Sequence, residues 1–305
     1  MRDRQFDSAS GHNMKTNVFN DLIDTCSVKV ENIEIFSKKT RDNENLEVKV
    51  DKNSGVIFID DFFVGSSEYF DGHYKNNLNN YNFNEFESFE DKVDSERRIK
   101  YFDNFITNKK ICDFGCGRGS FLRLARKNAK DVYGVEIQKN YLDLLNNNNI
   151  KCENNIENFN TKFDSIFMFH TLEHLPNQLA ILKNIKKYMN LNGSLIIEVP
   201  HANDFLLKNL KLKEFKEFTL WSQHLILHTK ESLKNFLVCA GFQDIQVNGF
   251  QRYSIANHFG WLKDKLPGGH KSELADIETP ALVKEYQDSL DKINATDTLI
   301  AYARS

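Results

Sequence analysis

The N-terminal part of the chain alternates apolar and polar residues in the manner of β-strands. From residue 28 to residue 65 the alternation runs through "SVKVENIEIF", "NLEVKVD" and "VIFIDDFFV". The "KNSG" before the last of these is a hairpin signal, with Gly55 placed for the turn. The pattern predicts a small antiparallel β-meander. We expect it to pack against the rest of the chain, because a meander of this size buries too little surface alone.

After residue 90 the pattern changes to an alternation of strands and helices. Helical spacing up to Ile106 comes first, and buried strand-like runs then alternate with amphipathic segments. The expected strands are "KKICDFG", "DVYGVE", "IKCEN", "FDSIFMF", "GSLIIEVP", "QDIQVNGFQRYSI" and "DTLIAYARS". Short links between such elements predict an α/β fold, with a parallel sheet covered by helices on both faces.

These patterns divide the chain into three regions. Residues 1–27 begin with a polar, charged stretch and are expected to be disordered or tag-like, outside the fold. Residues 28–90 are expected to hold the meander and an aromatic-rich segment, 66–90, which is either a surface connection or a flap over a site. Residues 91–305 are expected to form the α/β domain, with a helical insert at 258–295 before the last strand.

Composition and charge restrict the class of protein. The chain has 305 residues, of which 40% are hydrophobic and 27% charged, and its net charge is −3. This balance is typical of a globular protein, and without a basic excess we expect no nucleic-acid partner. The five cysteines contain no C-x-x-C pair, which favours a reducing, cytoplasmic location without structural zinc. No apolar run approaches the roughly 20 residues of a membrane span.

A glycine-rich loop and an acid point to a nucleoside ligand. Gly115, Gly117 and Gly119 follow a strand and open a helix, where free N–H groups favour a carboxylate or phosphate. Glu136 ends the next strand, the position from which an acid accepts hydrogen bonds from a ribose diol. The loop precedes a helix and the acid stands at a strand tip, and this context makes the signal stronger than the glycines alone.

The residues around the loop distinguish between nucleoside ligands. A dinucleotide loop has a third glycine where this chain has Ser120. Asp113 precedes the loop, and its charge is unfavourable beside a pyrophosphate but suits an ammonium group. S-adenosylmethionine carries a ribose, an ammonium group, a carboxylate and a sulfonium. The pattern therefore favours it over a nicotinamide dinucleotide.

The same motifs resemble those of class I S-adenosylmethionine-dependent methyltransferases. The resemblance runs from about residue 97 to the C-terminus, through "ICDFGCGRGSFL", "VYGVEI", "FDSIFMFHTLEHLPN", "LNGSLIIEVPHAND" and "HLILHTKESLKNFLVCAGF". These look like the branch that holds ubiquinone-type O-methyltransferases and many sugar and surface-polysaccharide methyltransferases. The resemblance implies a Rossmann-like, doubly wound sheet of seven strands in the order 3-2-1-4-5-7-6, with "DTLIAYARS" as the antiparallel last strand.

The resemblance also implies which residues bind S-adenosylmethionine. Its methionine end would lie on Asp113, Gly115, Cys116 and Gly117. Its ribose and adenine would lie on Glu136, Ile137, Asn155 and Ile156, although the family often has Asp where this chain has Asn155. Backbone groups of Phe169 and His170 would meet the amino group. Arg97 or Arg98 would reach the carboxylate, or would form a surface ion pair instead.

His170, Glu173 and His174 spell H-x-x-E-H, the spacing of a zinc-hydrolase helix. A zinc site needs that motif on a regular helix, but here it follows a buried strand and Pro176 comes directly after it. The segment is therefore expected to be a loop at the carboxyl edge of the sheet, with no metal. In such a loop His174 could act as a general base. The alternative is that Glu173 and His174 only attach the loop to the sheet through hydrogen bonds.

Several histidines fall where an acceptor hydroxyl would lose its proton during methyl transfer. His224 is the first candidate for general base and His174 the second, and an orienting or core role is the alternative for each. His228 lies beside a capping segment at Thr229 and is expected to be structural. The segment 201–227 and the aromatic residues of the insert are expected to enclose the acceptor, or simply to pack into the core.

The functional expectation is methylation of a small molecule, with O-methylation of a sugar, nucleotide-sugar or surface-polysaccharide intermediate favoured. A phenolic or quinone-like acceptor is an alternative. A nicotinamide-dependent oxidoreductase and a non-catalytic nucleoside-binding module are alternatives of another class. The [DN]-P-P-[YF] run of amino-methylating DNA enzymes is absent after the fourth strand. A homodimer is left open.

Overall fold

The computed structural model describes residues 16–63 and 83–305. Within these ranges seven strands form one mixed sheet in the order β10-β11-β8-β7-β4-β5-β6. The strands are β4 (Lys110–Phe114), β5 (Asp131–Val135), β6 (Lys151–Glu153), β7 (Phe163–Phe169), β8 (Met189–Pro200), β10 (Gln243–Phe250) and β11 (Thr298–Arg304). If β4 is counted as the first strand of this sheet and the sheet is followed from β6 to β10, the strand order is 3-2-1-4-5-7-6. This confirms the expected topology.

Strand directions also agree with the expectation. β4 to β8 pair in parallel, and β11 pairs antiparallel with both β8 and β10. β7 reads "FDSIFMF" and is almost completely buried, as a central parallel strand covered on both faces must be. The predicted strand after residue 242 ends earlier than expected, at Phe250, and a helix begins at Ile255.

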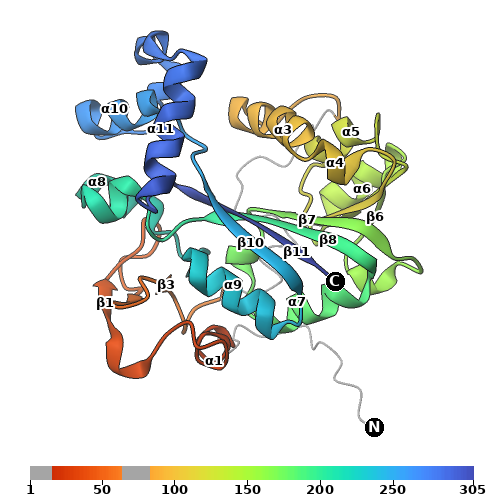
Figure 1. Ribbon diagram of the computed structural model, residues 1–305, viewed down its shortest axis with the longest axis horizontal. Coiled ribbons are helices and arrows are strands. Elements are labelled where there is room, and N and C mark those ends of the chain that lie inside the picture. The colour runs from red at the N-terminus through yellow and green to blue at the C-terminus, as the bar shows by residue number, and fades with distance from the viewer. Residues whose placement is uncertain (1–15, 64–82) are drawn as a thin grey trace.

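Helices cover both faces of this sheet (Figure 1). One face carries α4 (Asp103–Ile106), α5 (Ser120–Ala125) and α6 (Lys139–Asn147), and α3 (Phe89–Tyr101) packs on α5. The other carries α7 (Gln178–Lys187) and α9 (Lys230–Cys239). α9 begins at the capping box predicted from the sequence, in which Thr229 and Ser232 satisfy each other's backbone N–H groups.

The predicted meander is a second, four-stranded sheet. β1 (Ile33–Ser37), β2 (Val48–Asp51) and β3 (Ile57–Phe58) are antiparallel, and β9 (Ile226–Leu227) adds the fourth strand. Because β9 comes from the α/β domain, the meander is attached by backbone hydrogen bonds as well as by apolar packing. This agrees with the expectation that it cannot stand alone.

The expectation that residues 1–27 lie outside the fold is wrong for residues 16–27. Val18–Asp24 form α1, and Val18 and Leu22 are buried in the main core. The Asp21 carboxylate accepts a hydrogen bond from the backbone N–H of Leu179 at 3.1 Å, which fixes α1 to the start of α7. A seven-residue helix with two core positions is too short to give a clear periodic signal.

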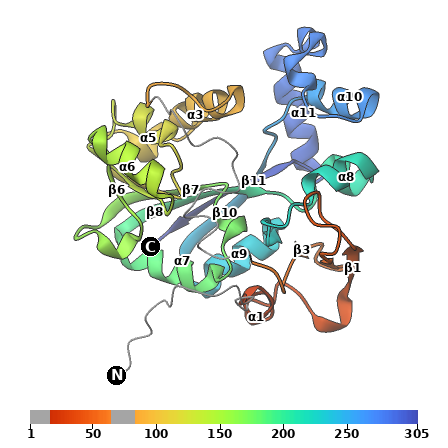
Figure 2. The same ribbon diagram turned by 180° about the vertical axis from the view of Figure 1, so that it is seen from behind.

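The helical insert forms a separate layer beside the sheet. α10 (Ile255–Asp264) and α11 (Pro280–Lys292) stand together at one end of the molecule, with α8 (Lys213–Thr219) next to them (Figures 1 and 2). Trp261 of α10 packs edge-on against Phe215 of α8, with ring centroids 5.2 Å apart. Most of the expected flap, residues 64–82, lies outside the described residues. Within the described ranges no helix combines the length and apolar character needed to span a membrane.

Candidate active site

The loop between β4 and α5 turns tightly across the end of β5. The backbone N–H groups of Gly115 and Cys116 donate to the carbonyl oxygen of Val135, at 2.8 and 3.1 Å. Gly117 has a φ of +53°, and a Cβ added there would meet no described atom within 4 Å. One side of the loop is therefore open to close approach by a ligand, as the sequence predicts.

Glu136 stands directly after β5 and is bonded to the same loop. Its carboxylate accepts hydrogen bonds from the backbone N–H groups of Gly117 and Gln138, both at 2.8 Å. Each carboxylate oxygen can accept a further hydrogen bond. The proposed ribose acid and the glycine loop thus lie side by side at the carboxyl edge of the sheet.

Asp113 lies near the end of β4, and its carboxyl group is buried. Its Oδ1 atom has no hydrogen-bond partner within residues 16–63 and 83–305. Burial raises the pKa of Asp113 to about 7; Arg98 opposes this shift and Glu136 adds to it. A buried carboxyl group with an unused oxygen suits a cationic ligand group, because such a group would compensate the charge.

The predicted adenine-side residues have different environments. Ile137 is partly exposed next to Glu136. Asn155 is exposed, and its side chain accepts a hydrogen bond from the backbone N–H of Glu157 at 3.1 Å. Ile156 is packed into the main core, so it positions this turn and offers little surface of its own.

Phe169 and His170 mark the end of β7. The ring of Phe169 packs among those of Phe102, Phe121 and Phe167, with centroids 5.0 to 5.7 Å apart. His170 follows with a φ of +49°, a left-handed conformation that costs a non-glycine residue roughly 1–2 kcal/mol. Its backbone N–H donates to the carbonyl oxygen of Glu198 at 2.8 Å, which helps to hold this strained turn.

The H-x-x-E-H segment is a loop, as expected, with only one 3-10 turn at Leu172–His174. The His170 ring lies between two carboxylates, with Nδ1 3.3 Å from Glu173 and Nε2 3.3 Å from Glu198. Burial lowers the pKa of His170, but the two carboxylates outweigh burial and the net shift is upward. His170 therefore holds a proton more readily than a free imidazole does, and a ring that is already protonated cannot act as the base.

A cavity of about 530 Å³ lies beside this loop. The cavity receives side chains from the segment 201–227 and from the insert, the two segments proposed from the sequence to enclose an acceptor. Its lining includes His174, Trp221, His224, Tyr253, Trp261 and His270. His170 also lines it, so the cavity adjoins the turn after β7 where the proposed nucleoside site begins.

His174 and His224, the two histidines proposed as bases, are neighbours in the lining of this cavity. Their ring centroids are 5.0 Å apart, and Trp221 packs edge-on against both rings. His174 Nδ1 donates to the backbone carbonyl oxygen of Gln223 at 2.9 Å, so in the neutral ring Nε2 carries the lone pair. Burial, with a smaller effect of His174, lowers the pKa of His224 to about 3. Burial also lowers the pKa of His174.

His228 and His201 are buried and are held by hydrogen bonds within the fold. His228 is completely buried between the Ser232 hydroxyl, at 3.0 Å, and the Gln178 side-chain oxygen, at 2.8 Å. This confirms the structural role expected for it. His201 Nδ1 donates to the Thr296 carbonyl oxygen at 2.9 Å, and His201 is also buried.

Sequence reasoning missed Arg41, which the small N-terminal sheet brings to the cavity. Arg41 follows β1, and its guanidinium group lies 4.6 Å from the centroid of the Trp221 ring. Its backbone N–H donates to the Leu220 carbonyl oxygen at 2.8 Å, and Ser222 donates to the carboxylate of Asp42. No motif surrounds Arg41 in the sequence, so only the packing of the two sheets reveals its place.

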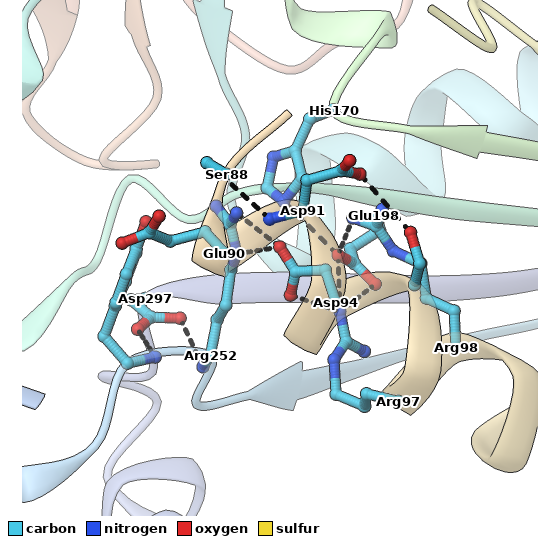
Figure 3. Close-up of polar contacts among 12 residues, drawn as sticks. Ser88, Glu90, Asp91, Asp94, Arg97, Arg98, His170, Glu198, Arg252 and Asp297 are labelled. Carbon is cyan, nitrogen blue, oxygen red and sulfur yellow. Dashed lines mark hydrogen bonds and ion pairs between the residues drawn. The ribbon is translucent and has the colours of Figure 1, made fainter. Parts of the chain in front are cut away.

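Arg97 and Arg98 form buried ion pairs, which excludes the surface pairing considered above. Both side chains bind Glu198, which is completely buried, at N–O distances of 2.8 and 2.6 Å (Figure 3). Burial opposes ionisation of Glu198, but Arg98, His170 and Arg97 outweigh it and hold its pKa well below the usual range. The strand end that carries Glu198 is thereby locked to α3.

A second group of charges extends this network to Arg252 and Asp297 (Figure 3). Asp94 binds Arg97 at 3.2 Å and also binds the guanidinium group of Arg252. Asp297 accepts hydrogen bonds from the backbone N–H groups of Arg252 and Tyr253, both at 2.9 Å. The network thus joins α3, β8 and the loop before α10, and it holds Tyr253 at the cavity.

Comparison with known proteins identifies the family. A family model described as "Methyltransferase domain" matches residues 86–247, more than half of the chain. The chain is 24% identical over 160 residues to a tRNA U34 carboxymethyltransferase from Campylobacter jejuni, covering 49% of this chain and 54% of the relative. It is 28% identical over 119 residues to a ubiquinone biosynthesis O-methyltransferase from Coxiella burnetii, covering 35% of this chain and 50% of the relative. The chain spans about half the length of the curated relatives it matches.

A solved structure of a SAM-dependent methyltransferase from Archaeoglobus fulgidus aligns with a TM-score of 0.49 and 18% identity, covering 70% of this chain and 94% of the other. The family match covers the glycine loop, Glu136 and the turn after β7, and the sheet has the strand order expected for this family. The chain belongs to the class I S-adenosylmethionine-dependent methyltransferases.

Proposed function

We propose that the protein transfers the methyl group of S-adenosylmethionine to a hydroxyl group of a sugar-sized acceptor, such as a nucleotide-sugar or a surface-polysaccharide intermediate. The observation that carries this proposal is the cavity of about 530 Å³ next to the turn after β7. Trp221, Tyr253 and Trp261 are among the residues that line it, and aromatic side chains of this kind can pack against a pyranose ring. Arg41 adds a positive charge suited to an anionic group on the acceptor, whereas Lys271 is paired with Glu90 of the same lining.

In this proposal the methionine amino group lies at Asp113 and the backbone of His170, and the carboxylate of the cofactor lies on the glycine loop. Glu136 accepts hydrogen bonds from the ribose hydroxyls, and Ile137 and Asn155 border the adenine. The unused Oδ1 of Asp113 and the open side of Gly117 support this placement.

The transfer is a displacement in which an acceptor oxygen attacks the methyl carbon. The new carbon–oxygen bond forms as the carbon–sulfur bond breaks, the sulfonium becomes a thioether, and the hydroxyl proton leaves to a base. His174 and His224 are the proposed proton acceptors. The lone pair on His174 Nε2, and the pKa of about 3 at His224, favour His174 over the sequence-based first choice.

A tRNA acceptor is the second candidate, because the relatives named above include a tRNA U34 carboxymethyltransferase. The net charge of −3 argues against it, since nucleic-acid binding draws on an excess of basic residues. A phenolic acceptor is the third, by likeness to the ubiquinone biosynthesis enzyme.

An acceptor assay separates these candidates. The protein is incubated with isotopically labelled S-adenosylmethionine and, in separate reactions, nucleotide-sugars, quinone-like phenols and unmodified tRNA. We expect a gain of one methyl group on a nucleotide-sugar hydroxyl, detected by mass spectrometry. Methylation of tRNA or of a phenol alone would overturn the sugar proposal and leave methyl transfer standing.

The proposed role of Asp113 predicts that cofactor binding depends on pH. The pKa of about 7 means that the carboxyl group gains a proton as the pH falls through neutrality. Only the ionised form attracts an ammonium group, so affinity for S-adenosylhomocysteine should fall below about pH 7 and level off above it. Calorimetric titration from about pH 5.5 to about pH 8.5, a range that brackets this pKa, measures the change.

Adenosine is the matched control ligand for this titration, because it has the ribose and the base but no ammonium group. Its affinity should change less across the same pH range. Equal pH dependence for adenosine and S-adenosylhomocysteine would show that Asp113 does not bind the amino group.

A further inference from the structure

Three side chains at the cavity wall converge in a way that methyl transfer alone does not explain. Glu173, His174 and His224 each offer one oxygen or nitrogen atom, and these atoms all lie within 4.8 Å of one another. All three residues line the cavity. Two come from the loop after β7, and the third comes from the segment before β9, so the fold itself brings them together.

Glu173 is completely buried, and neither carboxylate oxygen has a hydrogen-bond partner among the residues that the structure describes. The nearest ring nitrogens are His170 Nδ1 at 3.3 Å and His174 Nε2 at 4.0 Å. A buried carboxylate whose oxygens lack hydrogen-bond partners is costly unless another group, such as a cation, completes its environment.

His174 and His224 each have a ring nitrogen that could bind a metal ion. His224 Nδ1 is buried and has no hydrogen-bond partner in the described part of the chain. His174 donates a hydrogen bond through Nδ1 to the Gln223 carbonyl oxygen. In the neutral ring this leaves the lone pair on Nε2, on the other side of the ring. Metal-binding histidines almost always donate their second ring N–H in this manner, which fixes the tautomer.

We propose that Glu173, His174 and His224 bind one divalent transition-metal ion at the wall of the cavity. Two imidazoles and one carboxylate are a recurrent ligand set for such ions, with further positions open to water or substrate. Ligand atoms about 2.1 Å from one ion lie at most about 4.2 Å apart, so the three groups would draw together slightly on binding. His170 is not a ligand, and the site is therefore distinct from the H-x-x-E-H zinc helix considered from the sequence.

With the ion bound, His174 and His224 hold it and no longer accept the proton themselves, so this inference, which rests on the proposed function, replaces their part as bases. An acceptor hydroxyl at an open position of the ion would lose its proton to cavity water more readily, because a bound cation lowers the pKa of an oxygen ligand. The resulting alkoxide would attack the methyl carbon, with S-adenosylhomocysteine as the leaving group. Binding of the ion itself requires no methyl transfer and can be tested separately.

Mn²⁺ is the probe for that test, because its electron paramagnetic resonance signal distinguishes free from bound ion. It also interacts weakly with thiols, which matters because Cys26 and Cys239 are exposed. The wild-type protein is titrated with Mn²⁺ beside Glu173→Gln and His224→Phe. His270→Gln is the matched control, since His270 lines the same cavity but lies outside the three ligands.

We expect one bound Mn²⁺ per wild-type chain and at least about tenfold weaker binding in Glu173→Gln and His224→Phe, with His270→Gln unchanged. If Glu173→Gln fails to fold, His224→Phe decides the result. The proposal is overturned if the wild type binds no Mn²⁺, or if it binds as tightly in His224→Phe as in the wild type. Failure here leaves the acceptor assay unaffected, so the two proposals fail separately.

Discussion

Replacing Glu198 with glutamine is expected to lower the free energy of unfolding by about 3–5 kcal/mol, the usual scale for breaking a buried ion pair. Glu198 is completely buried and binds both Arg97 and Arg98. Glutamine keeps the shape of the side chain but cannot neutralise two cations that are themselves largely shielded from water. The penalty arises from these uncompensated charges, and chemical denaturation monitored by circular dichroism measures it.

Glu96→Gln is the control for this experiment, since it makes the same chemical change on the exposed side of α3. A surface substitution of this kind should alter stability by no more than about 0.5 kcal/mol. If Glu198→Gln is as stable as Glu96→Gln, the two arginines do not depend on Glu198, and the network does not lock α3 to β8.

Replacing Glu136 with alanine is expected to weaken binding of S-adenosylhomocysteine by ~1–3 kcal/mol, or roughly five- to 150-fold. The change removes the proposed acceptor of the two ribose hydroxyls. It also removes the acceptor of the Gly117 and Gln138 N–H groups, so the glycine loop loses a support. Isothermal titration calorimetry on the folded variant gives the ratio of affinities.

Asp131→Ala is the matched control for this variant. Asp131 is an exposed acid at the opposite end of the same strand, β5, far along the strand from the glycine loop. The Asp131→Ala variant should bind S-adenosylhomocysteine as tightly as the wild type does. An unchanged affinity in Glu136→Ala would mean that another residue binds the ribose.

The sequence was sufficient for those features that depend on local pattern. The buried run of β7 and the capping box at Thr229 each follow from a few neighbouring residues, and the structure contains both. The pairing of Glu136 with the glycine loop was also accessible, because consecutive parallel strands place their ends at one edge of the sheet.

Features that depend on distant segments were not accessible in this way. Arg97 and Glu198 are about a hundred positions apart, and nothing near either residue indicates that they pair across a buried interface. Arg41 reaches the cavity only because β3 pairs with β9 and brings the N-terminal sheet beside Trp221. These contacts are set by tertiary packing, which a hydrophobic pattern along the chain does not encode.

The loop after β7 shows how both kinds of information combine. The position of Pro176 and the preceding strand correctly predicted a loop in place of a helix. His170 and His174 have the spacing of a zinc motif, but in the structure His170 lies beside Glu198 and the ring partner of His174 is His224. That partner lies 50 positions further along the chain, where no local motif connects it to the loop.

A crystal structure of the protein with S-adenosylhomocysteine tests the central claim most directly. We expect the ribose hydroxyls within hydrogen-bonding distance of Glu136, the amino group beside Asp113, and the sulfur atom facing the cavity that His174 and His224 line. Density for the ligand at any other place on the chain, or an empty crevice at saturating ligand, would contradict the account.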